Sequence, residues 1–180
     1  MKVEVMGSGV SGLCCAHAFA ERGCEVSIIA ASEALDSTCC SWWAGGMLAP
    51  GCESESAEPL IATLGAESMA FWQGIAPDYT TAGTLVLATS RDQALLNNFA
   101  RNTEGWDTVE AAQLQSLEPD LAERFSRGLL FANQAPLDPR QTLKHLIDDL
   151  KNRGVRFTPR HTNKTPVPQT QPHRPTKRTV

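Results

Sequence analysis

The first thirty residues constrain the fold of this chain more than any other segment. The apolar run KVEVM, residues 2–6, predicts a short strand, and the loop GSGVSG follows it directly. A helix is predicted over 10–22 and a second strand over 24–30. Glycines in the spacing G-x-G-x-x-G, placed after a strand and at the start of a helix, are typical of a dinucleotide-binding βαβ unit with a right-handed crossover.

Each glycine of this loop has a separate task. Gly7 permits the tight turn, Gly9 lets the backbone approach a pyrophosphate, and Gly12 allows the helix to pack closely on the strand. The helix that begins at Val10 offers free N–H groups and the positive end of its dipole to the phosphates. The loop therefore predicts dinucleotide binding, the alternative being a structural glycine turn.

The end of the second strand lacks the acidic residue that usually bonds the ribose of a dinucleotide. Ala30 and Ala31 stand there, and Glu33 is the nearest carboxylate that follows. No arginine stands there for a 2′-phosphate, so a preference for NADP is not supported. These residues alone leave NAD and FAD both open.

The remaining sequence predicts alternating helices and strands. The long segment 31–59 contains Trp42 and Trp43, which either wall an active site or pack beneath the loop. The last helix has the clearest ends, with Asp138 as N-cap, Pro139 at its first position and Gly154 just past its end. Helices are predicted over 60–75, 92–102, 111–117 and from 139 to 153, and strands over 83–89, 127–133 and from 155.

Residues 158–180 differ in character from all that precedes them. They hold five prolines and no acid, which predicts a disordered, basic, Pro-rich tail. Residues 1–157 carry 11 Lys and Arg against all 20 Asp and Glu, a net charge of −9, whereas the tail carries +5. An acidic body argues against nucleic acid as a partner. Because a predicted strand ends in this tail, we favour premature truncation or a frame change over a native tail.

Other functional classes find little support. No apolar run approaches the roughly 20 residues of a membrane helix, and there is no signal-peptide pattern, so a cytoplasmic location is expected. The six cysteines lack zinc-ligand spacing, so we predict reduced thiols and no metal site. We nominate no catalytic residue, because Arg91 and Arg140 are interpreted as surface residues at helix starts.

Three segments together resemble the FAD-dependent D-amino-acid oxidase superfamily, and within it the glycine oxidase of thiamine biosynthesis. They are the N-terminal loop region, SWWAGGMLAP at 41–50, and LDPRQTLKHLIDDLKNRGVRF at 137–157. The resemblance covers residues 1–157. It implies an FAD-dependent enzyme that oxidises glycine or other small amines with oxygen to an imine and releases hydrogen peroxide. The implied partners are thus a small amine and oxygen, with no membrane and with a homo-oligomer left open.

The fold implied is α/β, a Rossmann-like FAD-binding βαβ unit with part of an antiparallel substrate-domain sheet. FAD-binding segments are expected at about 1–60 and 136–157, and the partial substrate domain at about 78–135. Arginine, tyrosine and histidine residues that the family uses for substrate lie in a second half, and no residue here matches them.

The resemblance also implies FAD contacts, residue by residue. Ala30 replaces the family's acid, and Cys40 stands where small polar residues are common. The implied contacts are Gly7, Gly9, Val10, Ser11 and Gly12 at the pyrophosphate, Ala30 and Ala31 at the adenosine ribose, Cys40 and Ser41 near the phosphate and ribityl chain, and Gly45, Gly46 and Met47 at the isoalloxazine. Two other interpretations remain: an NAD-binding dehydrogenase or binding module, which needs the glycine loop alone, and an inactive fragment whose cofactor site does not close.

Overall fold

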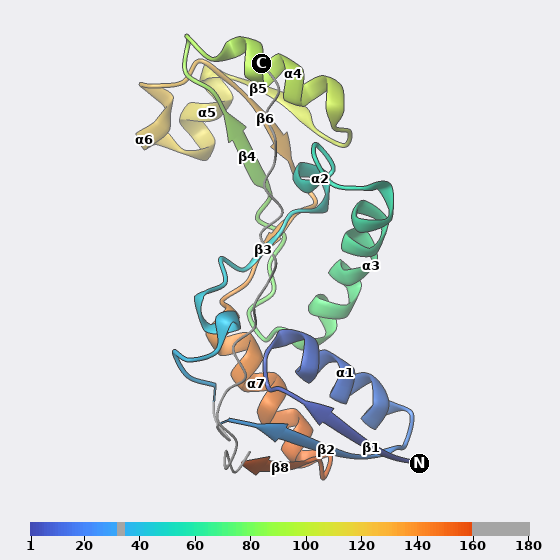
Figure 1. Cartoon of the computed structure of the whole chain (residues 1–180). Coiled ribbons are helices and arrows are strands. Elements are labelled where there is room, and N and C mark those ends of the chain that lie inside the picture. The colour runs from blue at the N-terminus through green and yellow to red at the C-terminus, as the bar shows by residue number, and fades with distance from the viewer. Residues whose placement is uncertain (32–34, 160–180) are drawn as a thin grey trace, which may run out of the picture.

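The structure is a computed structural model that describes residues 1–31 and 35–159. It has a lower and an upper lobe, and the two-stranded ribbon of β3 (Met47–Leu48) and β7 (Ala135–Pro136) runs between them (Figure 1). Glu33 and the predicted tail from residue 160 onward lie outside the described residues.

The lower lobe contains the predicted βαβ unit. Strands β1 (Lys2–Met6), β2 (Glu25–Ala30) and β8 (Arg156–Pro159) form a parallel sheet in the order β1-β2-β8. Helices α1 (Val10–Glu21) and α7 (Pro139–Asn152) contact each other on the same side of this sheet (Figure 1). β8 extends to Pro159, two residues beyond the predicted end of the folded body.

The core of the lower lobe lies between the sheet and these two helices. Apolar side chains recur along α7 at helical spacing, so that one face of the helix is buried. In β2 the buried side chains alternate with half-buried ones. The buried core residues are Leu13, Ala16, Val26, Ile28, Ala30, Leu143, Leu146, Ile147, Leu150 and Val155.

Strand β2 ends in a continuous apolar run, a pattern typical of a strand that is covered on both faces. Among the described residues, however, helices cover only one face, and Ser27 and Ile29 on the other face stay half-buried. The apolar run therefore includes a residue, Ile29, that the described part of the chain does not fully bury.

The ends of α7 confirm the capping prediction. The Asp138 carboxylate accepts hydrogen bonds from the backbone N–H groups of Arg140 at 2.9 Å and Gln141 at 3.1 Å. These bonds, that of Gln141 first, hold the pKa of Asp138 below its ordinary value. Gly154 adopts the left-handed conformation just after the helix, at φ +84°.

The upper lobe is an antiparallel sheet, as predicted, with strand order β4-β6-β5. Its strands are β4 (Thr84–Leu87), β5 (Asp107–Glu110) and β6 (Arg127–Phe131), and its helices are α4 (Gln93–Asn102), α5 (Ala111–Leu117) and α6 (Pro119–Ala122). The prediction missed β5, whose segment DTVE contains one apolar residue. The largest buried cluster of the upper lobe contains Leu96, Leu129 and Phe131.

A long segment joins the lobes and includes structure that the sequence did not predict. The 3-10 helix η1 (Cys40–Trp43) and the short helix α2 (Pro50–Glu53) lie within residues 31–59, where no helix was predicted, and α3 (Pro59–Ile75) follows. Buried Gln134 connects α2 to β4. Its amide N–H donates to Thr84 Oγ1 (2.7 Å), and its oxygen accepts from the backbone N–H of Gly51 (3.0 Å).

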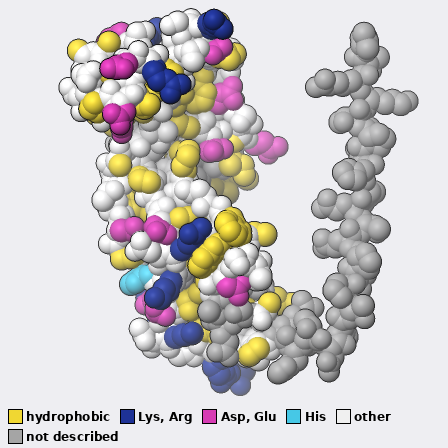
Figure 2. Space-filling model, turned by 90° about the vertical axis from the view of Figure 1, so that its left-hand side faces the viewer, with side chains coloured by type: hydrophobic (Ala, Val, Ile, Leu, Met, Phe, Trp, Pro, Cys, Tyr) yellow, Lys and Arg dark blue, Asp and Glu magenta, His cyan; other side chains and the backbone are white. Residues whose placement is uncertain are grey.

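The surface mixes polar and hydrophobic side chains. On the face shown in Figure 2, hydrophobic side chains lie beside basic ones in the lower half of the molecule. Helix α3 contains no buried residue and exposes Leu60, Ile61 and Leu64. Within residues 1–31 and 35–159, no helix has both the length and the apolar character needed to cross a membrane.

Candidate functional site

The glycine loop has the geometry that its spacing predicts. Gly7 has φ +100°, which favours glycine, and its N–H donates to the Ile29 carbonyl at 2.8 Å, so the turn is bonded to β2. A Cβ added at Gly12 would lie 2.1 Å from the Gly7 carbonyl oxygen. A Cβ at Gly9 would lie 3.3 Å from Ser41 Oγ. Glycine at positions 7 and 12 is thus required by conformation and by space.

The N-terminus of α1 faces the loop that follows β2. The Val10 N–H donates to Ser41 Oγ at 3.0 Å, across 31 residues of sequence. Within the described part of the chain, the N–H groups of Ser11 and Gly12 have no hydrogen-bond acceptor. Two free donors at the positive end of a 12-residue helix are suited to bind the oxygens of a phosphate group.

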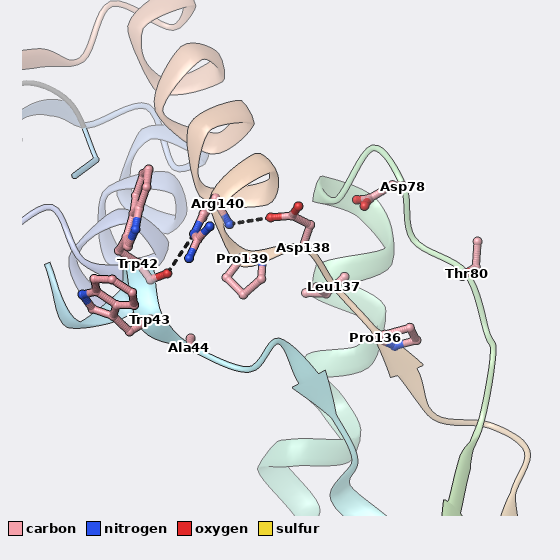
Figure 3. Close-up of a pocket in the computed structure, with 10 residues that line it drawn as sticks. All are labelled: Trp42, Trp43, Ala44, Asp78, Thr80, Pro136, Leu137, Asp138, Pro139 and Arg140. Carbon is pink, nitrogen blue, oxygen red and sulfur yellow. Dashed lines mark hydrogen bonds between the residues drawn. The ribbon is translucent and has the colours of Figure 1, made fainter. Parts of the chain in front are cut away.

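Ser41 is held in this position by the start of α7. The Arg140 guanidinium lies over the ring of Trp42 at 4.8 Å and near that of Trp43 at 5.8 Å. Its Nε also donates to the Trp42 carbonyl oxygen at 3.3 Å (Figure 3). Arg140 is exposed, as predicted for a residue at a helix start, but it also fixes η1 against α7.

The Gly-Gly-Met segment runs past the same end of α7. Gly46 has φ +71°, and a Cβ added to it would lie 2.1 Å from the Leu137 carbonyl oxygen. The Leu137 N–H in turn donates to the Gly46 carbonyl at 2.7 Å. Met47 pairs with Pro136 in the β3–β7 ribbon and is 62% exposed. The backbone at this point is therefore fixed while the Met47 side chain is free to contact a ligand.

These segments meet around one cavity of about 190 Å³. Four residues that the resemblance implies as FAD contacts line it: Val10, Ser41, Gly46 and Met47. The remaining lining is apolar apart from Thr142 of α7, whose buried hydroxyl has no hydrogen-bond partner among the described residues. We refer to this space as the α1–α7 cavity.

Other implied contacts lie outside the α1–α7 cavity. Ala30 is buried at the end of β2, and Ala31 is exposed on the bend that follows. Cys40 and Gly45 are exposed in the loop, and Ser11 is exposed on α1. The end of β2 carries no carboxylate at positions 30 and 31. The described residues therefore provide fewer hydrogen-bonding groups for the ribose than the start of α1 provides for the pyrophosphate.

A second, larger cavity of about 540 Å³ adjoins this region (Figure 3). Trp42, Trp43 and Ala44 line one side, and Pro136 to Arg140 line another, with Asp78 and Thr80 from the segment after α3. The two tryptophans thus line a cavity and also stack with Arg140. Sequence reasoning nominated neither Arg140 nor Thr142. The DPRQT segment signals a helix start, but only the fold brings these two side chains to η1 and to the α1–α7 cavity.

The described residues suit FAD at two of the places that the resemblance implies, the pyrophosphate and the flavin ring. Free N–H donors and Ser41 suit a pyrophosphate, and a Cβ added at Gly45 would meet no atom within 4 Å, so the chain is open beside that residue. Thr142 is an orphaned polar group at the same cavity. Among the described residues, the donors at the start of α1 are compatible with a flavin dinucleotide.

Comparisons with known proteins identify the family and the fold. A family model described as FAD dependent oxidoreductase matches residues 2–167. A Rhizobium etli protein designated a candidate thiamine biosynthesis oxidoreductase, ThiO, is 40% identical over 159 residues, which are 88% of this chain and 48% of the relative. The chain therefore spans about half the length of the curated relative that it matches.

Solved structures share the fold at low sequence identity. Glycine oxidase of Geobacillus kaustophilus has a TM-score of 0.70 at 19% identity, over 86% of this chain and 45% of that one. L-α-glycerophosphate oxidase of Mycoplasma pneumoniae, solved with FAD bound, has a TM-score of 0.67 at 17% identity, over 87% and 44%. These likenesses confirm the predicted α/β fold. Because the family model matches nearly the whole sequence, the chain belongs to the family of FAD-dependent oxidoreductases, and FAD is its cofactor.

Proposed function

We propose that this chain provides the cofactor-binding part of an oxidase that acts on glycine or another small amine. The observation that carries the proposal is the convergence of Val10, Ser41, Gly46 and Met47 on the α1–α7 cavity. The 40% identical relative, designated a thiamine biosynthesis oxidoreductase, supports the oxidoreductase class. The small amine as substrate rests on the resemblance to the glycine oxidase of thiamine biosynthesis. The shared fold alone does not choose the substrate, since glycine oxidase and glycerophosphate oxidase both have it.

The reaction proposed is the two-electron oxidation of an amine. Glycine, oxygen and water give glyoxylate, ammonia and hydrogen peroxide, with an imine that water hydrolyses. When bound, FAD would supply the two-electron acceptor for this oxidation, with oxygen as the final oxidant.

Residues of this chain bind and orient the cofactor in this proposal. The N–H groups of Ser11 and Gly12 bind pyrophosphate oxygens, and Ser41 fixes the first turn of α1 through Val10. The backbone at Gly45 and Gly46 supports the flavin ring from one side, because no Cβ at position 45 projects toward it. The chain's own arginines have no assigned part in substrate binding.

Titration of the purified protein with FAD tests the cofactor site. We expect quenching of flavin fluorescence and a shifted flavin absorbance spectrum. Ser41→Ala removes the acceptor for the Val10 N–H and is expected to weaken FAD binding, whereas Ser37→Ala changes an exposed serine and is the matched control. Binding of NADH in place of FAD would contradict the proposal and favour a dehydrogenase.

Peroxide release tests the reaction. The FAD-loaded protein is assayed with glycine and a panel of small primary and secondary amines, with peroxidase-coupled detection of hydrogen peroxide. Amine-dependent peroxide supports the proposal. FAD binding without peroxide from any amine would retain the cofactor site and overturn amine oxidation by this chain.

A further inference from the structure

Thr142 carries a buried hydroxyl that the fold leaves unpaired. The residue is 1% exposed, on the face of α7 that packs into the lower lobe. A threonine within a helix usually bonds the carbonyl one turn earlier or points to water. Here the carbonyl of Asp138 accepts from the Thr142 backbone N–H at 2.9 Å, and Oγ1 has no partner among the described residues. Buried polar groups are nearly always paired, so this hydroxyl requires an explanation.

The position of Thr142 indicates a ligand as that explanation. Thr142 lines the α1–α7 cavity together with Val10 and Ser41 at one end of the implied cofactor and Gly46 and Met47 at the other. Ser41, the other hydroxyl side chain in this lining, already accepts the Val10 N–H. A trapped water would need two to four polar partners. Apart from Ser41 and Thr142, the side chains of the lining are apolar: Ala44, Leu48, Trp72, Leu137, Pro139 and Leu143.

Thr142 lines the same cavity as residues that the proposed function assigns to the pyrophosphate end and to the flavin ring. In FAD these two groups are joined by the ribityl chain, a polyol whose hydroxyls both donate and accept hydrogen bonds. A threonine hydroxyl has the same dual capacity. We propose that Thr142 binds the ribityl chain of FAD, an inference that rests on the cofactor site proposed above.

Two substitutions separate the hydroxyl from the packing of this side chain. Thr142→Val keeps the shape and removes the hydroxyl, while Thr142→Ser keeps the hydroxyl and removes a methyl group. With flavin fluorescence quenching as the readout, we expect Thr142→Val to raise the Kd for FAD by about 2- to 13-fold, the range for one hydrogen bond. We expect Thr142→Ser to stay closer to the wild type.

Stability of the protein without FAD provides a second measurement. Valine removes an unpaired buried polar group, so the melting temperature of the FAD-free protein should stay the same or rise. A folded Thr142→Val protein that binds FAD as tightly as the wild type overturns the inference. So does a pattern in which Thr142→Ser, and not Thr142→Val, weakens binding, because that pattern indicates packing alone.

ADP identifies which part of FAD the hydroxyl contacts, because ADP has the pyrophosphate and adenosine but no ribityl chain. Displacement of FAD by ADP should give the same inhibition constant for the wild type and Thr142→Val. An equal loss of ADP affinity would place the hydroxyl at the pyrophosphate and overturn the ribityl assignment. A wild-type chain that binds no FAD would instead overturn the proposed function, which is a separate result.

Discussion

The two lobes of this chain differ in how they are stabilised. Among the described residues, the lower lobe buries ten in one cluster between a parallel sheet and two helices, whereas the largest buried cluster of the upper lobe has three. Helix α3, which runs alongside the joint, buries no side chain. Every implied cofactor contact lies in the lower lobe or in the loop and ribbon that continue from it. The site is therefore built on the better packed half of the chain.

The largest expected effect on the free energy of unfolding comes from removing a buried leucine side chain from the core of each lobe. Leu146 in the lower lobe and Leu129 in the upper lobe are both essentially buried. Leu146→Ala should lower the free energy of unfolding by about 2–5 kcal/mol. Leu129→Ala should cost nearer to about 2 kcal/mol, because a site with fewer buried neighbours collapses more easily around the lost atoms. Urea unfolding followed by circular dichroism measures both. An equal or larger cost for Leu129→Ala would contradict the difference between the lobes.

A smaller but more specific effect is expected at the glycine loop. Gly12→Ala places a Cβ against the Gly7 carbonyl, a backbone atom that cannot rotate away, and should cost about 1–3 kcal/mol. The same change should abolish FAD binding, because it moves the turn away from the helix N-terminus. Fluorescence quenching and thermal melting measure the two effects.

Gly74→Ala is the matched control for this change. Gly74 is exposed in α3, and a Cβ there would meet no atom within 4 Å. The control should be neutral or stabilise the protein by about 0.4–1 kcal/mol, because alanine restricts the unfolded chain. Normal FAD binding by Gly12→Ala would show that close packing of α1 on the loop is not what forms the site.

The same difference between lobes explains how far the sequence could predict the fold. The βαβ unit and α7 were predicted because their signals are local: a glycine loop, a helical apolar face, and caps at Asp138 and Gly154. In the upper lobe, β4 and β6 were predicted from apolar runs. β5 was missed, because only Val109 of its four residues is buried and its pairing with β6 is a tertiary event.

Prediction of the site met the same limit. The glycine loop and the Gly-Gly-Met segment are visible as motifs, so Gly7, Gly12 and Gly46 stand where conformation or lack of space requires glycine. Thr142 has no motif. Its position in the α1–α7 cavity depends on packing of α7 against segments about a hundred residues earlier in the chain. Sequence spacing cannot supply a contact of that kind.

The smallest expected effect concerns charges at the edge of the lower sheet. Glu25 on β2 accepts from the Arg156 guanidinium of β8 at 2.8 Å and lies 3.4 Å from Lys2 of β1, so one carboxylate links three strands. The hydrogen bond from Arg156, followed by that from Lys2, lowers the pKa of Glu25 below its ordinary 4.5. Because the folded state has the lower pKa, this stabilisation is present above pH 4.5 and is lost as the pH falls below it.

Comparison of the wild type with Glu25→Gln isolates this contribution from the other carboxylates. The difference between their urea midpoints should be small and positive above pH 4.5 and should vanish as Glu25 takes up its proton. Glu4→Gln on the neighbouring strand changes an exposed carboxylate with no partner among the described residues, so it is the matched control and should change the urea midpoint little at neutral pH. A difference for Glu25→Gln that persists well below pH 4.5 would contradict a contribution from charge, because protonated glutamate and glutamine have the same shape and neither carries a charge.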